Sequence, residues 1–215
     1  MIKAILFDLD GVIVDSLHYH YLAWDHMFKE IGGSVTEESI FLTEGMNSFE
    51  ILPHFLKQFK VDLPEEQHKK FIEEKRKYFR QIAKLTYYPY AFETISELRD
   101  RGYTTALVTA CARKNMEMSI DTEHQKLFDF IISGDDVPRS KPNPDPYLIA
   151  QKTLGLEVSD CVAVENAPLG VESVKNAGMI CIAVESTLSK KYLQKADFII
   201  NGIEELPGFF PRLKR

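Results

Sequence analysis

The chain has 215 residues and a formal net charge of −6, with no basic block outside the tail at residues 212–215. This charge argues against a nucleic acid or an anionic membrane as partner. No apolar run reaches transmembrane length, and the chain begins with a strand-like run where a secretory leader would have a charged start and a signal core. We therefore expect a cytoplasmic protein, either a monomer or a weak dimer.

The three cysteines, Cys111, Cys161 and Cys181, are widely spaced and form no C-x-x-C pair. This spacing is typical of reduced cytosolic thiols and gives no zinc pattern. Cys161 and Cys181 lie inside apolar, strand-like runs, so we expect them in the core. Cys111 follows a motif described below and is expected near the site, without a catalytic role.

The first ten residues form an apolar run that carries Asp8 and Asp10 at its end, just before Gly11. Such a run predicts a central strand of a parallel sheet covered on both faces. Aspartate is rare in strands and costly to bury, so the pair indicates a site at the carboxyl edge of the sheet. If the strand continues to Asp10, both side chains point the same way and can hold a cation. Alternatively, one aspartate caps a helix and the other begins a turn.

Residues 16–84 contain no strand signal and read as helices. Capped helix starts are expected at Ser16, Thr36 and Asn47, and breaks at Gly32, Gly33 and Gly45. A long, highly charged helix is expected from about residue 64 toward residue 85. These features predict an inserted helical cap domain at residues 16–84.

Strands and helices alternate through the rest of the chain. A helix is expected at residues 91–101, and strands at residues 103–109, 128–133, 160–165, 179–184 and 197–200. This alternation implies parallel pairing with right-handed crossovers. The predicted fold class is α/β, with a Rossmann-like parallel sheet core at residues 1–15 and 85–215 and an all-helical cap.

Three further stretches place reactive side chains after strands or in loops. At a strand-to-helix turn, the Thr109 hydroxyl and the backbone around Ala110 can bind phosphate oxygens, although threonine is common in strands and caps. Lys141 precedes Pro142 in a stiffened loop, where Asn143 is expected to cap a helix and Pro144 to open it.

The last of these stretches ends a buried strand with Glu165, followed by Asn166. Asn166 can cap the following helix.

These stretches resemble, in order, the four core motifs of the haloacid dehalogenase superfamily of phosphotransferases. The similarity rests on D-x-D-G from Asp8, the strand ending at Thr109, S-K-P-x-P-D-x-Y around Lys141, and E-N-x-x-x-G from Glu165. The stretch H-x-x-A-W from His20 is similar to the cap of the branch that includes β-phosphoglucomutase and sugar-phosphate phosphatases. In the fourth motif of this branch the acids help to bind Mg²⁺, and the branch usually has aspartate where this chain has Asn166. An amide oxygen can still reach the ion but brings no charge, so the resemblance implies weaker metal binding here, with Glu165 as the safer ligand.

The resemblance implies a Mg²⁺-dependent phosphohydrolase that acts on a small phosphorylated metabolite, such as a sugar phosphate. Asp8 would be the nucleophile and form an aspartyl-phosphate, and Asp10 would be the general acid and base. The residues expected to bind Mg²⁺ are Asp8, the Asp10 carbonyl, Glu165 and Asn166. Those expected to bind the phosphoryl group or the substrate are Thr109, Ala110, Lys141, His20, Trp24 and Lys75.

Two other functions stay open. β-Phosphoglucomutase is the first alternative, but the mutase-like cap has an arginine shortly after its loop glycine, and none occurs at residues 44–49. Lys75 or Arg76 could replace that second cationic grip, or be ordinary solvated charges. The second alternative is a phosphate-responsive binding module that accepts phosphate on Asp8 and does not turn over. A second form of this alternative is a catalytically impaired relative, suggested by Asn166.

Overall fold

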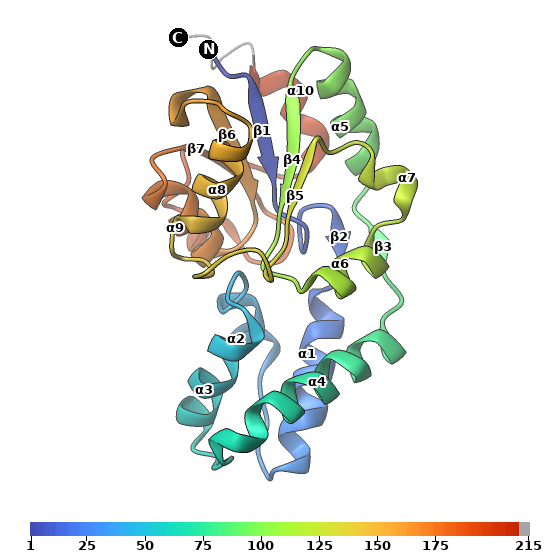
Figure 1. Ribbon diagram of the computed structural model, residues 1–215, viewed down its shortest axis with the longest axis vertical. Helices are drawn as coiled ribbons and strands as arrows, with labels where there is room; N and C mark the ends of the chain where they lie inside the picture. The colour runs from blue at the N-terminus through green and yellow to red at the C-terminus, as the bar shows by residue number, and fades with distance from the viewer. Residues whose placement is uncertain (211–215) are drawn as a thin grey trace.

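The structure is a computed structural model that describes residues 1–210, so the basic tail at residues 212–215 lies outside the described residues. An α/β part and a helical part stand one above the other in Figure 1. We keep the names cap for residues 16–84 and core for residues 1–15 and 85–210, as our proposed division of the chain. Within residues 1–210, none of the helices is both long and apolar enough to cross a membrane.

The core contains a six-stranded sheet in the order β5-β4-β1-β6-β7-β8. Every neighbouring pair in this sheet is parallel, as the alternation of strands and helices predicts. The strands are β1 (Ala4–Phe7), β4 (Thr104–Val108), β5 (Phe130–Ile132), β6 (Cys161–Glu165), β7 (Ile180–Val184) and β8 (Phe198–Ile200). The expected α/β fold class is therefore confirmed.

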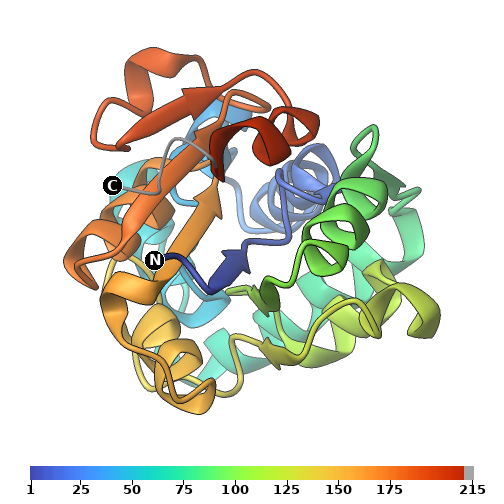
Figure 2. The same ribbon diagram turned by 90° about the horizontal axis from the view of Figure 1, so that it is seen from above.

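Strand β1 is the central strand, and its side chains alternate between two apolar layers. Ile5 and Phe7 belong to one hydrophobic cluster and Ala4 and Leu6 to the other. The first cluster includes residues of α5 (Ala91–Asp100) and α10 (Leu206–Phe209). The second cluster includes residues of α8 (Asp145–Thr153) and α9 (Pro168–Asn176). Figure 2 shows these two pairs of helices on opposite faces of the sheet.

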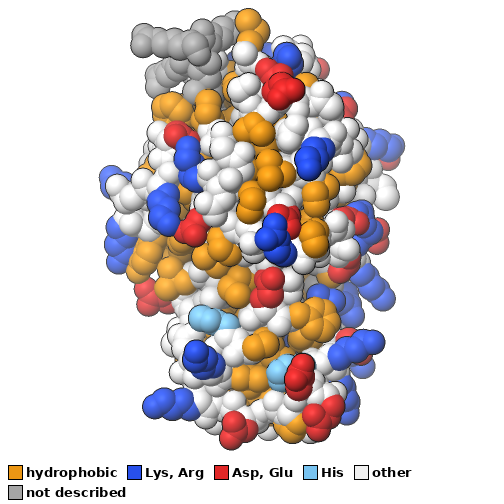
Figure 3. All heavy atoms as spheres, turned by 60° about the vertical axis from the view of Figure 1, so that its left-hand side comes forward, with side chains coloured by type: hydrophobic (Ala, Val, Ile, Leu, Met, Phe, Trp, Pro, Cys, Tyr) orange, Lys and Arg blue, Asp and Glu red, His pale blue; other side chains and the backbone are white. Residues whose placement is uncertain are grey.

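Short elements complete the core. They are α6 (Arg113–Ser119), α7 (Thr122–Gln125) and the 3-10 helices Val158–Asp160, Lys190–Tyr192 and Ile203–Glu205. On the face in Figure 3, basic and acidic side chains are interspersed rather than gathered into a block of one sign.

The cap consists of α1 (Leu17–Glu30), α2 (Glu37–Leu42), α3 (Ser48–Phe59) and α4 (Glu65–Ile82). It has a hydrophobic cluster of its own, in which Trp24, Phe28 and Phe55 pack edge to face. Thr36 and Asn47 cap α2 and α3 through capping boxes, as the sequence predicts.

The expected cap at Ser16 is wrong. Ser16 precedes α1, but its side chain makes no capping hydrogen bond. Its hydroxyl instead donates to the Asp10 carboxylate, and the residue is fully buried. A hydrogen bond to a buried carboxylate is charge-assisted and strong, so it fixes the orientation of the Ser16 hydroxyl.

A short antiparallel ribbon joins the two parts of the molecule. It pairs β2 (Val14–Asp15) with β3 (Thr86–Tyr87) through Val14 and Tyr87. The proposed cap limits, residues 16 and 84, lie just inside this ribbon. The chain thus enters and leaves the cap beside the carboxyl end of β1.

Candidate active site

Three adjacent parallel strands deliver the central side chains of the site. β1 pairs with both β4 and β6, and Asp8, Thr109 and Glu165 lie at the carboxyl ends of these strands. β1 ends at Phe7 rather than continuing to Asp10, although the Asp8 N–H still donates to the Val164 carbonyl at 3.0 Å. Asp8 and Asp10 nevertheless both reach the same cleft, Asp10 from the turn that follows the strand.

The cleft lies between core and cap and contains about 630 Å³ of space, part of it open to solvent. The expected site residues that line the cleft are Asp8, Asp10, His20, Trp24, Lys75, Thr109 and Ala110. Trp24 also packs inside the cap and is only 1% exposed. Lys141, Glu165 and Asn166 are buried next to the cleft and do not line it.

Lys141 holds two acids of the site together. Its Nζ donates to Asp8 Oδ1 and to Glu165 Oε1, each at 2.6 Å. Glu165 Oε1 also accepts the Tyr147 hydroxyl at 2.5 Å, and Glu165 Oε2 accepts the Asn166 N–H at 3.1 Å. Burial lowers the pKa of Lys141, but the charges of Asp8 and Glu165 outweigh it and raise that pKa, so the lysine stays a cation.

Two expectations for the Lys141 loop are wrong. Pro144 is the N-cap residue of α8 rather than its first helical residue, and Asn143 makes no capping hydrogen bond. The Asn143 amide instead donates to the Ser140 carbonyl at 3.0 Å. This hydrogen bond stabilises the loop that presents Lys141.

The nucleophile candidate Asp8 lies in an excess of negative charge. Burial raises its pKa to about 7, and the charges of Glu165 and Asp10 add to this increase while Lys141 opposes it. Asp8 Oδ1 faces Lys141, but Asp8 Oδ2 is buried with no hydrogen-bond partner in residues 1–210. A cation at Oδ2 would satisfy this oxygen and lower the pKa of Asp8.

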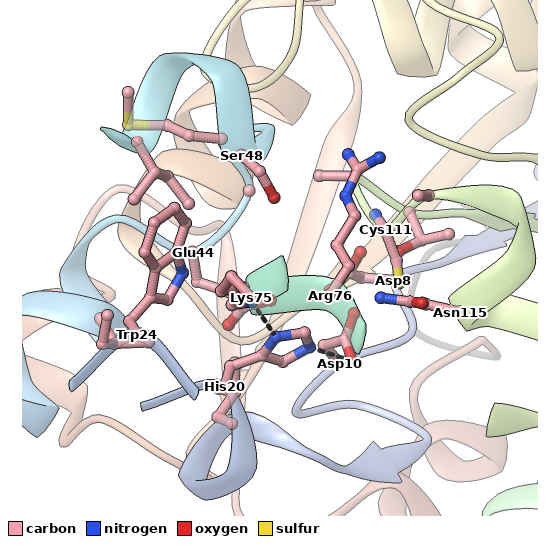
Figure 4. A pocket seen from close by; sticks show the side chains of 18 residues that line it. Asp8, Asp10, His20, Trp24, Glu44, Ser48, Lys75, Arg76, Cys111 and Asn115 are labelled. Atoms are coloured by element: carbon pink, nitrogen blue, oxygen red, sulfur yellow. Dashed lines mark hydrogen bonds and ion pairs between the residues drawn. The ribbon is translucent and has the colours of Figure 1, made fainter. Parts of the chain in front are cut away.

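Asp10 connects to the cap through His20. His20 Nε2 lies 3.7 Å from Asp10 Oδ1, and Figure 4 shows the imidazole between Asp10 and Lys75. Burial acts to raise the pKa of Asp10, but His20 and the Ser16 hydroxyl outweigh it, and the pKa is lowered. Burial also lowers the pKa of His20, and so does the nearby Lys75.

Glu44 is a site residue that the sequence reasoning missed. It lies on the loop between α2 and α3, lines the cleft, and accepts a hydrogen bond from Asn166 Nδ2 at 3.0 Å through its Oε2. Burial raises the pKa of Glu44, and so do the charges of Asp8, Glu165 and Asp10. The available signal was an acid directly before Gly45, which breaks the run between two capped helices.

The Asn166 side chain does not cap α9, because Ala167 is the N-cap residue and makes no side-chain cap. Asn166 is fully buried, and its Oδ1 has no hydrogen-bond partner among the described residues. Over residues 1–210, no group of three or more His, Cys, Asp or Glu side chains is placed to hold a metal ion. The amide and carboxylate oxygens of Asn166 and Asp8 nevertheless fit Mg²⁺, which prefers oxygen ligands.

Cys111 lines the cleft as a free thiol, near the site as expected. Burial raises its pKa well above the usual range, so the thiol stays protonated and is a poor nucleophile. The Cys111 N–H donates to the Thr109 hydroxyl at 2.9 Å, which orders the turn after β4.

Comparisons with known proteins show the family to which this chain belongs. Residues 5–184 match the family model described as haloacid dehalogenase-like hydrolase. Hexitol phosphatase A from Escherichia coli is 30% identical over 210 residues, covering 95% of this chain and 93% of that protein. A solved β-phosphoglucomutase from Clostridium difficile superposes with a TM-score of 0.85 at 25% identity, covering 99% of this chain and 97% of that one.

A longer relative is Protein SUPPRESSOR OF QUENCHING 1 from Arabidopsis thaliana, 31% identical over 199 residues. The match covers 91% of this chain but 19% of that protein. The chain belongs to the haloacid dehalogenase-like hydrolases. Its relatives are named as phosphatases and as phosphoglucomutase, which confirms the expected class of enzyme.

Proposed function

We propose that this protein is a Mg²⁺-dependent phosphohydrolase of small phosphorylated metabolites, such as sugar phosphates, and that it works through an aspartyl-phosphate. The observation that carries the proposal is the position of Asp8. Its carboxylate lines the cleft while Lys141, 2.6 Å away, holds one of its oxygens. A phosphate monoester repels a carboxylate, so the site must supply cations and fixed donors before attack. Lys141 and the turn at Thr109 and Ala110 supply part of this positive field.

The first step transfers the phosphoryl group to Asp8. An Asp8 carboxylate oxygen attacks phosphorus, the bond between phosphorus and the substrate oxygen breaks, and Asp10 gives a proton to the leaving alcohol. The pKa of Asp10 is lowered in the free protein. The negative charge of an arriving phosphate raises that pKa, so Asp10 gains its proton as the substrate binds.

The second step releases phosphate. Asp10, now ionised, takes a proton from water, and the resulting hydroxide attacks phosphorus. The bond between phosphorus and Asp8 then breaks, which restores the Asp8 carboxylate and frees inorganic phosphate. Ser16 and His20 favour the ionised form of Asp10 that this step needs.

The residues that would hold Mg²⁺ are Asp8, Asn166 and the Asp10 backbone carbonyl. Glu165 Oε2 keeps a free lone pair beside its bond from the Asn166 N–H, so Glu165 stays a further candidate. When bound, Mg²⁺ would offset negative charge on the phosphoryl oxygens and on Asp8.

The alternative function is β-phosphoglucomutase, which must also hold the second phosphate of a bisphosphate. From the loop after α2, the cleft is lined by Glu44, Gly45, Met46 and Ser48, which include no cation. The cations that line it from the cap are Lys75 and Arg76 of α4. Because the loop supplies no cation for a second phosphate, we favour the hydrolase over the mutase. The binding module without turnover is the third candidate function.

We also infer a cytoplasmic location. The cysteines Cys111, Cys161 and Cys181 are free thiols, as is typical of a reducing compartment.

The test is Mg²⁺-dependent phosphate release from a panel of sugar phosphates. Asp8→Asn should abolish release, and Asp100→Asn, an exposed aspartate at the end of α5, should leave it unchanged. β-Glucose 1-phosphate should be assayed with a trace of its 1,6-bisphosphate. Glucose 6-phosphate without free phosphate would identify a mutase, and a folded protein that yields neither product would favour the binding module.

A further inference from the structure

The orientation of the Asn166 amide is fixed by two neighbours. Its Nδ2 lies 3.0 Å from Glu44 Oε2 and 3.0 Å from Thr187 Oγ1. In this orientation the amide nitrogen donates to the Glu44 carboxyl group, and the amide oxygen points away from it. Both N–H groups are then used. The amide oxygen Oδ1 stays buried and, within residues 1–210, without a hydrogen-bond partner.

Asp8 Oδ2 is a second buried oxygen without a hydrogen-bond partner among the described residues, and Asp8 itself is 2% exposed. Asp8 and Asn166 follow the neighbouring strands β1 and β6 at the same edge of the sheet. Leaving a buried oxygen without a hydrogen-bond partner reduces the free energy of unfolding. Two such oxygens at one edge of the sheet therefore indicate a cation-binding site.

Glu44 brings a carboxyl group to this edge from the cap, and a cation bound there would favour its ionised form. Asn166 is neutral, so the two unpaired oxygens of Asp8 and Asn166 come with only one carboxylate charge for a metal ion. Glu44 makes up the difference from the opposite side of the cleft. The loop that carries Glu44 lies close to the core, since a Cβ on Gly45 would be 3.0 Å from Lys141 Cβ. Gly45 also has a φ of +99°, a backbone conformation that favours glycine.

We propose that Glu44 is a positioning residue for Mg²⁺: it orients and polarises the Asn166 amide, and it supplies from the cap the charge that the core lacks at position 166. This inference rests on the metal site of the proposed function. It has a consequence for cap movement. Because Glu44 reaches Asn166 only when the cap lies against the core, Mg²⁺ binding and cap closure strengthen each other by the same factor.

The experiment measures Mg²⁺ binding directly, by titration calorimetry with MgCl₂ and no substrate. Glu44→Gln should weaken Mg²⁺ binding by about 10- to 100-fold, as the loss of groups that orient metal ligands commonly does. The double variant Glu44→Gln with Asn166→Asp moves the charge into the core and should restore the affinity. Glu73→Gln removes one exposed negative charge elsewhere on the cap, on α4, and should leave the affinity unchanged.

A second readout separates metal binding from general stability. Mg²⁺ should raise the Tm of the wild type more than that of Glu44→Gln, each compared with its own metal-free Tm. Equal affinities of wild type and Glu44→Gln would overturn this inference, and so would a double variant as weak as Glu44→Gln. A wild type that binds no Mg²⁺ would instead contradict the metal site of the proposed function.

Discussion

Lys75 Nζ lies 3.0 Å from His20 Nδ1 inside the cap. The lysine also lies over the Trp24 ring, 5.0 Å from its centre, and is 2% exposed. The Lys75 ammonium group is therefore removed from water. The neighbouring His20 imidazole, whether neutral or protonated, offers it no negative charge. Burial consequently lowers the pKa of Lys75 to about 7.

This lowered pKa predicts a pH-dependent stability. Above pH 7 the folded protein loses the Lys75 proton while the unfolded chain keeps it up to about pH 10.4. The unfolded state then binds more protons, so Lys75 makes the free energy of unfolding rise with pH, by at most about 1.4 kcal/mol per unit. Below pH 7 the buried charge destabilises the fold. Lys75→Met should therefore be most stable relative to wild type near pH 6, and this advantage should shrink toward pH 9.5.

Urea unfolding at several pH values measures this effect. Lys77→Met is the matched control, because Lys77 is exposed on the same helix. If the stabilities of Lys75→Met and wild type run parallel across this pH range, the buried lysine does not change its charge there.

Arg76 should determine which substrates bind tightly. It lines the cleft next to Lys75, makes no salt bridge within residues 1–210, and lies with its Cζ 5.6 Å from the Phe49 ring centre. Figure 4 shows its guanidinium directed into the cleft. An unpaired guanidinium suits a second anionic group on the substrate.

Arg76→Ala should raise KM about tenfold for substrates that carry a second phosphate or a carboxylate. Substrates with a single phosphate should keep their KM, and Lys77→Ala should change neither class. Steady-state kinetics on paired substrates provides the measurement. A uniform loss on both classes would show that Arg76 supports the cap rather than the substrate.

Gly170 should be essential for the position of Glu165. A Cβ at Gly170 would lie 2.1–2.2 Å from the Glu165 carboxylate atoms, which hold Lys141 in place. Gly170→Ala should displace that carboxylate and reduce phosphate release on the order of 10²-fold. Gly208→Ala is the control, because a Cβ there would meet nothing within 4 Å.

Phosphate release and Tm should be measured for both glycine variants. Gly208→Ala should keep its activity. An active Gly170→Ala would mean that Glu165 can move without loss, and would remove Glu165 from the set of residues that position Lys141.

The sequence was sufficient for the fold and for most of the residues that meet in the cleft. An apolar run with two acids at its end predicted a covered parallel strand with a site at its edge, and β1 with Asp8 and Asp10 follows this prediction. The cap helices were likewise predictable, since Thr36 and Asn47 mark two of their starts by local hydrogen bonding alone. Several strands were predicted one or two residues too long: β4 is Thr104–Val108 where residues 103–109 were expected, and β5 is Phe130–Ile132 where residues 128–133 were expected.

Tertiary structure decided which partner each polar side chain takes. Ser16 and Asn143 have the local sequence of helix caps, but their side chains donate to Asp10 and Ser140 in the preceding turn and loop instead. Glu44 and Asn166 are 122 positions apart, and nothing local to either residue predicts their contact. Their hydrogen bond depends on how the cap lies against the core. Periodicity and capping act over a few residues and can be read from the chain, whereas the charge balance of a buried site is a sum over elements that only folding brings together.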